Sequence, residues 1–195
     1  MTNPQRAQKP VVANISNRHI HLCAADMEKL FGAGHTLKKV KDLMQPGEHA
    51  CEEIVTITGP RSSIERVRIL GPLRTVTQVE ISLTDSIKIG VKAPVRSSGN
   101  VQGSASIVIT GPAGKVELAE GCIVAKRHVH MTPADADFYG IKDNEIISIK
   151  CGGDRGLIFD NVVARVSDRM ALECHLDTDE ANAAGIRSGD MIIIL

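Results

Sequence analysis

One ten-residue pattern occurs twice in this chain and constrains its fold more than any other feature. Residues 17–26 read Asn-Arg-His-Ile-His-Leu-Cys-Ala-Ala-Asp, and residues 126–135 read Lys-Arg-His-Val-His-Met-Thr-Pro-Ala-Asp. Both copies contain Arg-His-apolar-His-apolar and end on Ala-Asp, and they start 109 residues apart, at 17 and 126. Two copies indicate two related half-structures, because a solenoid needs at least three stacked repeats.

Short segments of β character separated by glycine turns surround the two copies. Alternating polarity and β-branched residues predict strands, at 11–15, 53–58, 65–69, 78–84, 106–110, 146–150, 161–166 and 191–195. Good helix formers predict short helices, at 24–31, 133–138 and 179–184. In the strand at 78–84, Val79, Ile81 and Leu83 are expected to face the core, and Gln78 and Glu80 to lie on the opposite face.

These elements predict a mainly β (α+β) fold. We expect two β-barrels, each capped by short α-helices and related by the internal repeat. We assign 11–32 together with 121–195 to the first barrel domain, 33–120 to the second, and 1–10 to an N-terminal tail.

Composition excludes several classes of function. Lys and Arg number 23, as do Asp and Glu, and aromatic residues make up 2%. A neutral chain with so few aromatic rings argues against nucleic-acid binding. No apolar run approaches the length of a membrane span, and the polar N-terminus is unlike a signal peptide, so we expect a cytoplasmic protein. Five cysteines without a CxxC pair favour reduced thiols, or a single metal ligand, over disulfides.

Four of the seven histidines lie in two His-x-His pairs, His19 with His21 and His128 with His130. Residues i and i+2 of a strand project to the same side, so each pair presents two imidazoles together. Imidazole nitrogen is a preferred zinc ligand, and a catalytic zinc has about three protein ligands and one open position. Recurrence of the pair inside a longer repeat favours two metal sites over surface histidines.

Each pair needs a third ligand from elsewhere in the chain. Glu80 is one candidate, and His175 is another, with Glu173 and Asp177 on the same strand face as alternatives or as partners of His175. Arg74 precedes the strand at 78–84, where its guanidinium can bind two phosphate oxygens at once.

The chain resembles the PduL-type phosphate acyltransferases over nearly its whole length from Val11 onward. The motifs that carry the resemblance occur in order, at 15–22, 71–85, 90–96, 125–131 and 172–182. The resemblance implies two helix-capped barrels with a two-zinc site between them. It assigns His19, His21 and Glu80 to one zinc that meets the sulfur of coenzyme A, and His128, His130 and His175 to a second zinc completed by water.

The resemblance also implies substrates and partners. It assigns Arg74 to phosphate, and Ser16 and Arg68 to positions near the coenzyme. The expected reaction converts propanoyl- or acetyl-coenzyme A and phosphate reversibly to acyl phosphate and coenzyme A, in acetate or propionate metabolism. A homodimer is expected. Residues 2–10 show no apolar helical face, which argues against packaging in a bacterial microcompartment.

The histidines by themselves leave two other functions open. A zinc-dependent hydrolase would use the same ligands but would release free acid without a requirement for phosphate. A non-catalytic barrel with structural zinc would need closed four-ligand sites. No Cys or Ser lies in a recognisable nucleophile elbow, so we expect direct transfer in a ternary complex, although Cys23 lies close to the first pair.

Overall fold

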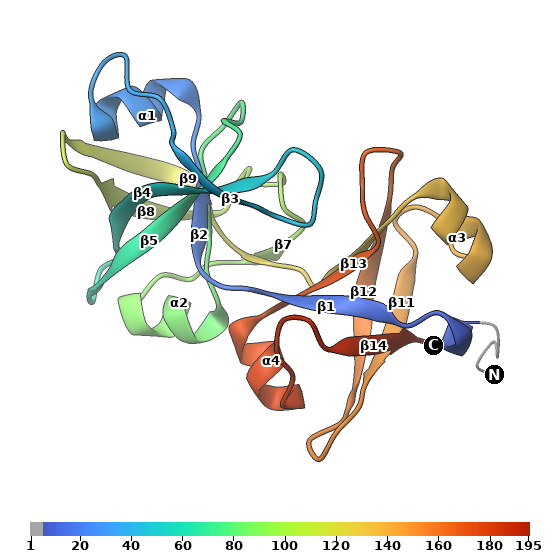
Figure 1. Ribbon diagram of the computed structural model, residues 1–195. Helices are drawn as coiled ribbons and strands as arrows, with labels where there is room; N and C mark the ends of the chain where they lie inside the picture. The colour runs from blue at the N-terminus through green and yellow to red at the C-terminus, as the bar shows by residue number, and fades with distance from the viewer. Residues whose placement is uncertain (1–5) are drawn as a thin grey trace. The chain divides into compact units, whose positions relative to one another are not determined.

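The computed structural model describes residues 6–195 and contains two compact units, each built around a six-stranded mixed β-barrel (Figure 1). One unit comprises the described residues up to Ser16, residues 44–46 and residues 126–195, and we call its barrel the terminal barrel. The other comprises residues 17–43 and 47–125, and we call its barrel the central barrel.

The terminal barrel closes in the order β1, β13, β10, β12, β11, β14, and β14 pairs back with β1. Its strands are β1 (Val11–Ser16), β10 (His128–Met131), β11 (Ile146–Cys151), β12 (Ile158–Val166), β13 (Glu173–Asp177) and β14 (Met191–Ile194). The 3-10 turn η1 (Arg6–Gln8) and the helices α3 (Pro133–Tyr139) and α4 (Thr178–Ala184) belong to the same unit.

The central barrel closes in the order β9, β6, β2, β5, β4, β8, because β8 pairs with both β4 and β9. Its strands are β2 (His19–His21), β4 (His49–Thr58), β5 (Ser63–Gly71), β6 (Gln78–Glu80), β8 (Ala105–Thr110) and β9 (Lys115–Ala125). Two further strands extend it, β3 (Lys39–Asp42) at β4 and β7 (Val95–Arg96) at β9, and the helices are α1 (Ala24–Phe31) and α2 (Leu83–Ile89).

The two rings run through the same sequence of pairings. Starting from β1 in one and β9 in the other, both read parallel, antiparallel, parallel, and then three antiparallel pairs. The repeat strands β2 and β10 therefore hold equivalent places, as do β6 and β13. This confirms the expectation of two barrels related by the internal repeat.

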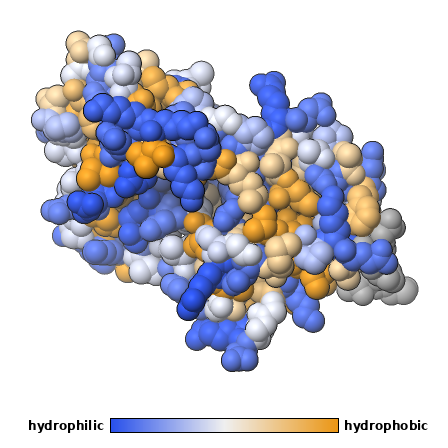
Figure 2. All heavy atoms as spheres, in the orientation of Figure 1, coloured by the Kyte–Doolittle hydropathy of each residue, from blue (hydrophilic) through white to orange (hydrophobic). Residues whose placement is uncertain are grey.

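The middle residue of each His-x-His pair anchors its strand in a barrel core. Ile20 and Val129 are both 0% exposed, in separate clusters of buried apolar side chains. Burying such a side chain stabilises the fold by about 1.5–3 kcal/mol. Four cysteines are buried, Cys23 is half-buried, and all five are free thiols. Apolar side chains also reach the surface, where Figure 2 shows them interspersed with hydrophilic residues.

Polar side chains cap the starts of α3 and α4, and a glycine in the left-handed conformation ends each helix. Asp177 accepts a hydrogen bond from the backbone of Glu180 at the start of α4, and Gly185 ends this helix in the left-handed conformation. Thr132 and Asp135 form a capping box on α3, and Gly140 is its left-handed C-cap.

The predicted strand at 78–84 is wrong in its second half. Strand β6 ends at Glu80, and Leu83 begins helix α2 with its side chain 54% exposed. Ser82 caps this helix by accepting a hydrogen bond from the backbone of Asp85. The capping residue therefore starts a helix here, although the alternating pattern predicts a strand.

The division between the units also differs from the predicted one. Residues 17–32 belong to the unit of the central barrel, because β2 pairs with β5 and β6. The repeat shows that the two copies occupy equivalent places in two barrels. It does not predict with which strands each copy pairs. Among the described residues, no helix is long and apolar enough to cross a membrane.

Candidate metal centres

The first His-x-His pair and Glu80 form one cluster of possible metal ligands in the central barrel. Antiparallel pairing of β2 with β6 sets His19 opposite Glu80 and His21 opposite Gln78. One ligand atom from each of His19, His21 and Glu80 lies within 4.8 Å of the others, and all three residues are buried. We call this set the central cluster.

Hydrogen bonds orient two possible metal ligands of the central cluster, His19 and Glu80, toward each other. His19 Nδ1 donates to the carbonyl oxygen of Asn17 at 2.8 Å, and His19 Nε2 lies 3.6 Å from Glu80 Oε2. The other carboxylate oxygen, Glu80 Oε1, accepts from Gln78 Nε2 at 2.6 Å and from Ser98 Oγ at 2.7 Å. Such outer hydrogen bonds fix the orientation of first-sphere ligands at metal sites.

His21 is buried with its Nδ1 atom lacking a hydrogen-bond partner among the described residues. Burial, together with the neighbouring His19 and Arg74, lowers the pKa of His21 to about 3. The imidazole is therefore neutral at neutral pH, which is the protonation state that binds a metal ion. A buried, unsatisfied and neutral imidazole fits a metal site.

The second His-x-His pair and His175 form an equivalent cluster in the terminal barrel. Antiparallel pairing of β10 with β13 sets His128 opposite His175 and His130 opposite Glu173. One ligand nitrogen from each of the three histidines lies within 4.8 Å of the others. We call the set of His128, His130 and His175 the terminal cluster. Glu80 and His175 occupy matching positions in the two barrels.

Two ring nitrogens of the terminal cluster approach each other closely. His128 Nδ1 donates to the carbonyl oxygen of Lys126 at 2.7 Å, and His130 Nδ1 lies 3.2 Å from the Met170 sulfur, a weak acceptor. The two Nε2 atoms lie 3.0 Å apart, and when each ring carries its proton on Nδ1 both of them present lone pairs. Two such nitrogens repel unless they share a proton or a cation. Ligands of a tetrahedral zinc lie about 3.3 Å apart, so the spacing fits a zinc ion.

Burial and the neighbouring His128 and His175 lower the pKa of His130 to about 2, so this imidazole is neutral as well. The partner of His175 is Glu173, whose Oε1 lies 3.1 Å from His175 Nε2. Burial raises the pKa of the Glu173 carboxyl, but hydrogen bonds from His175, Gln45 and Asn14 outweigh burial and lower it. Glu173 is therefore a carboxylate that orients His175, the pattern of metal-binding histidines.

Arg74 is joined to the central cluster through Ser98. Its Nη1 donates to Ser98 Oγ at 3.3 Å, and the same hydroxyl donates to Glu80. Its Nη2 lies 3.1 Å from Glu48 Oε1, and both side chains are about a third exposed. The backbone nitrogen of Arg74 also donates to the carbonyl oxygen of Leu22, next to His21. The structure thus brings a guanidinium to the central cluster.

The remaining expected residues, Ser16 and Arg68, belong to neither cluster of possible metal ligands. Ser16 ends β1 in the unit of the terminal barrel, opposite Asp177. Arg68 lies on β5 opposite His19, and its guanidinium donates to the carbonyl oxygen of Cys51. None of the cysteines belongs to either cluster of possible metal ligands.

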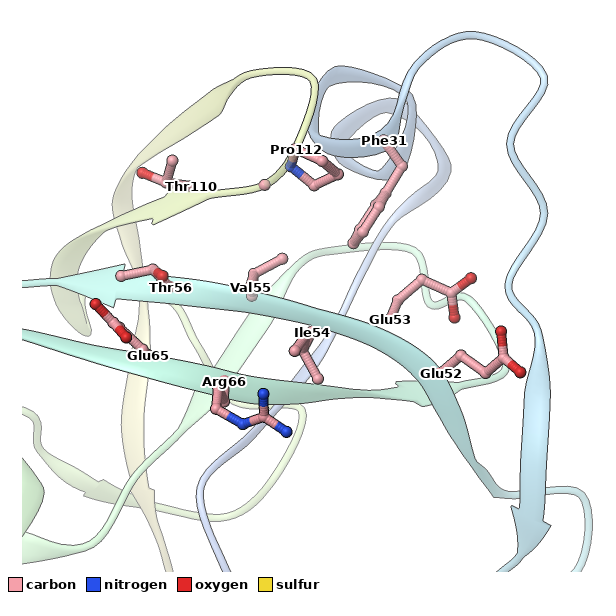
Figure 3. A pocket seen from close by; sticks show the side chains of 11 residues that line it. Phe31, Glu52, Glu53, Ile54, Val55, Thr56, Glu65, Arg66, Thr110 and Pro112 are labelled. Carbon is pink, nitrogen blue, oxygen red and sulfur yellow. The ribbon is translucent and has the colours of Figure 1, made fainter.

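A separate pocket of 610 Å³ in the unit of the central barrel contains none of the expected site residues (Figure 3). Glu53 lies in its wall and accepts hydrogen bonds from the His35 ring at 2.8 Å and from the Lys38 backbone at 3.2 Å. This buried carboxylate is already satisfied, so the pocket does not supply the metal chemistry.

Three partners of the clusters were not singled out from the sequence. Ser98 lies in a Ser- and Gly-rich segment, and the pattern gives no sign that it reaches Glu80. Asn14 and Gln45 both donate to Glu173, from residues 159 and 128 positions away in sequence. Only tertiary structure makes such contacts visible. Glu173, by contrast, was expected as a ligand or partner of His175.

The family model and the relatives that match this chain carry the same description. A family model described as phosphate propanoyltransferase matches residues 12–187. The phosphate propanoyltransferase of Thermotoga maritima is 51% identical over 191 residues, which cover 97% of this chain and 91% of that protein. The proteins of the same name from Clostridioides difficile and Salmonella typhimurium are 53% and 51% identical, over 92% and 91% of this chain and 86% and 85% of theirs.

Proposed function

The chain belongs to the phosphate propanoyltransferase family, and we propose that it transfers a short acyl group between coenzyme A and inorganic phosphate. A phosphate oxygen attacks the carbonyl carbon of the thioester, a carbon–oxygen bond forms, and the carbon–sulfur bond breaks with departure of the thiolate. The products are acyl phosphate and coenzyme A. The observation that carries the proposal is the chain of hydrogen bonds from Arg74 through Ser98 to Glu80, because it joins a guanidinium, which is suited to phosphate, to a candidate metal ligand.

Zinc fits both clusters of ligands, with two ions per chain. His19, His21 and Glu80 would hold one ion, and His128, His130 and His175 the other. When bound at such sites, zinc stabilises thiolates and acts as a Lewis acid toward carbonyl or phosphate oxygens. Three protein ligands at each site leave one position for a substrate or water, which is typical of catalytic zinc.

Arg74 is the residue that we assign to phosphate. Its guanidinium carries several donors in one plane and can bind two phosphate oxygens at once. The partial exposure of its side chain leaves it accessible to an anion from solvent. Phosphate binding would replace the Glu48 carboxylate, while Ser98 keeps the guanidinium oriented toward the central cluster. Fixing phosphate against the thioester removes much of the entropic cost of bringing two substrates together.

Glu80 is held in one orientation by its neighbours. Gln78 and Ser98 both donate to Oε1, so Oε2 is the oxygen directed at His19. In the terminal cluster Glu173 plays the corresponding part by holding the His175 ring. Both arrangements prepare ligands before a metal ion binds, which lowers the ordering cost of binding.

Further features follow from the family resemblance and are part of the proposal. Ser16 and Arg68 contact the coenzyme, the acyl group is propanoyl or acetyl, and the protein is a cytoplasmic homodimer.

Release of thiol from propanoyl-coenzyme A, measured with and without phosphate, tests the reaction. We expect thiol release only with phosphate and propanoyl phosphate as the product.

Arg61 is an exposed arginine in the unit that also contains Arg74, so Arg61→Gln is the control for substitutions of Arg74 and should keep wild-type turnover. Thiol release without phosphate, with propanoate as the product, would identify a hydrolase and contradict the proposal.

A further inference from the structure

The two barrels share a second device besides the His-x-His pairs, and it consists of one arginine and one acid in each. Arg18 immediately precedes His19, and Arg127 immediately precedes His128. Asp85 follows Glu80 by five positions, and Glu180 follows His175 by five. Each acid occupies the third position of the short helix after the strand that carries the third ligand.

Both arginines form ion pairs with these acids. Arg18 Nε donates to Asp85 Oδ2 at 2.7 Å and Arg18 Nη2 to Asp85 Oδ1 at 2.8 Å, a bidentate pair. Arg127 Nη1 donates to Glu180 Oε1 at 2.7 Å, and its Nε donates to the carbonyl oxygen of Asp160 at 2.8 Å. The side chain of Asp85 is only 4% exposed and that of Arg18 is 34% exposed, so the carboxylate of this pair is shielded from solvent.

Each ion pair links the beginning of a His-x-His strand to the helix that follows the third-ligand strand. The acid is also tied to its own helix start, because its backbone nitrogen donates to the cap residue, Ser82 in one barrel and Asp177 in the other. The cap residue lies two positions after the third ligand, Glu80 or His175. Four consecutive links therefore connect the first histidine to the third ligand in both barrels.

From this repeated geometry we infer that Arg18 with Asp85, and Arg127 with Glu180, are positioning residues that set the distance between the His-x-His strand and the third metal ligand. None of the four is a ligand. The ion pair instead fixes the register and spacing of β2 against β6 and of β10 against β13. The inference rests on the metal sites of the proposed function and adds a function for residues outside them.

A merely structural ion pair would behave differently from a positioning one. Removing either arginine leaves a carboxylate whose side chain is only 4% (Asp85) or 18% (Glu180) exposed without its cationic partner, and lowers stability in both cases. A positioning pair, however, acts selectively on its own cluster. Loss of an outer partner of a metal site typically weakens metal binding by about 10- to 100-fold. Arg18→Gln should therefore weaken zinc binding at the central cluster alone, and Arg127→Gln at the terminal cluster alone.

The test measures zinc affinity by competition with a chromophoric chelator. The central cluster is isolated in a His130→Ala background, and the terminal cluster in a His21→Ala background. Adding Arg18→Gln to the first background should weaken zinc binding about 10- to 100-fold, whereas Arg127→Gln in that background should change it less than about twofold. The second background should show the reverse. Arg61→Gln and Arg155→Gln, at exposed arginines of the two units, are the controls.

A double variant, Arg18→Met with Asp85→Leu, separates positioning from stability, because it leaves no unpaired charge. We expect it to regain thermal stability relative to Arg18→Gln but to keep the weakened zinc affinity. Recovery of both together would overturn the inference, as would equal zinc affinities for Arg18→Gln and its control. If the background variants themselves bind no zinc, the proposed metal function fails instead.

Discussion

Replacing Glu173 with glutamine should weaken metal binding at the terminal cluster while leaving the shape of the side chain almost unchanged. Glu173 is 3% exposed and accepts hydrogen bonds from three side chains, those of Asn14, Gln45 and His175. Glutamine offers one carbonyl oxygen and one amide group, so the amide group meets a donor. The Gln45 amide is held in place by both the nitrogen and the oxygen of Ala171, so it does not simply rotate.

The size of the effect follows from these contacts. At least one charge-assisted hydrogen bond is lost, which is worth about 1.5–3 kcal/mol of folding free energy. The orientation of His175 loses its carboxylate partner, which should lower zinc affinity by about 10- to 100-fold. That change corresponds to about 1.4–2.8 kcal/mol of binding free energy.

Zinc affinity and thermal unfolding of Glu173→Gln provide the assay, again in the His21→Ala background that isolates the terminal cluster. Asp168→Asn, an exposed change in the same unit, is the control and should alter neither quantity. If Glu173→Gln unfolds at a lower temperature but binds zinc as tightly as the control, Glu173 supports the fold only, and the reasoning about His175 is refuted.

Three further perturbations test other parts of the account. Arg74→Lys keeps the charge but loses the planar fork, so it should raise KM for phosphate more than KM for acyl-coenzyme A; equal effects on both substrates in steady-state kinetics would count against Arg74 as the phosphate residue. Ser98→Ala removes a donor to Glu80 and the acceptor of Arg74, so zinc affinity at the central cluster should fall while the terminal cluster keeps its affinity, and a chelator titration showing both unchanged would exclude this link. Thr132→Ala removes the cap of α3 and should cost about 1 kcal/mol of unfolding free energy in a denaturant titration, with an unchanged midpoint showing that the cap contributes nothing.

The sequence allowed the members of the two clusters to be predicted better than the boundaries of the fold. A His-x-His pair on a strand presents both imidazoles to one side whatever the surrounding topology, so the paired ligands follow from local geometry. Glu80 and His175 were candidates because alternation on their strands directs them to a polar face, and the family resemblance assigned them to the metal ions. That face proved to be buried against the histidines, which pairing of β6 with β2 and of β13 with β10 explains.

The end of β6 shows why local pattern has limits. Val79, Ile81 and Leu83 alternate as a strand would, yet Ser82 and Asp85 also form a helix start, and that signal decides the structure. Both signals are present in the same seven residues, so periodicity alone could not separate them. The partition of 17–32 between barrels depends on pairing with distant strands, which no local pattern encodes.

Contacts across long sequence separations account for the rest. Gln45 donates a hydrogen bond to Glu173. It lies in residues 44–46, which belong to the unit of the terminal barrel although the chain on both sides of them belongs to the unit of the central barrel. The Arg18 and Arg127 pairs likewise became recognisable only after the two rings could be compared strand by strand. The repeat shows an arginine before each His-x-His pair, but no local pattern indicates the acid with which that arginine pairs.

The central claim is that phosphate-dependent acyl transfer requires metal ions at both clusters. Zinc titration of chelator-treated protein, followed by formation of propanoyl phosphate from propanoyl-coenzyme A and phosphate, tests it most directly. The account predicts no product without metal and a rise in turnover that ends near two zinc ions per chain, with Glu80→Ala and His175→Ala each unable to reach it. Full turnover of the metal-free protein, or full turnover of either variant, would contradict the claim.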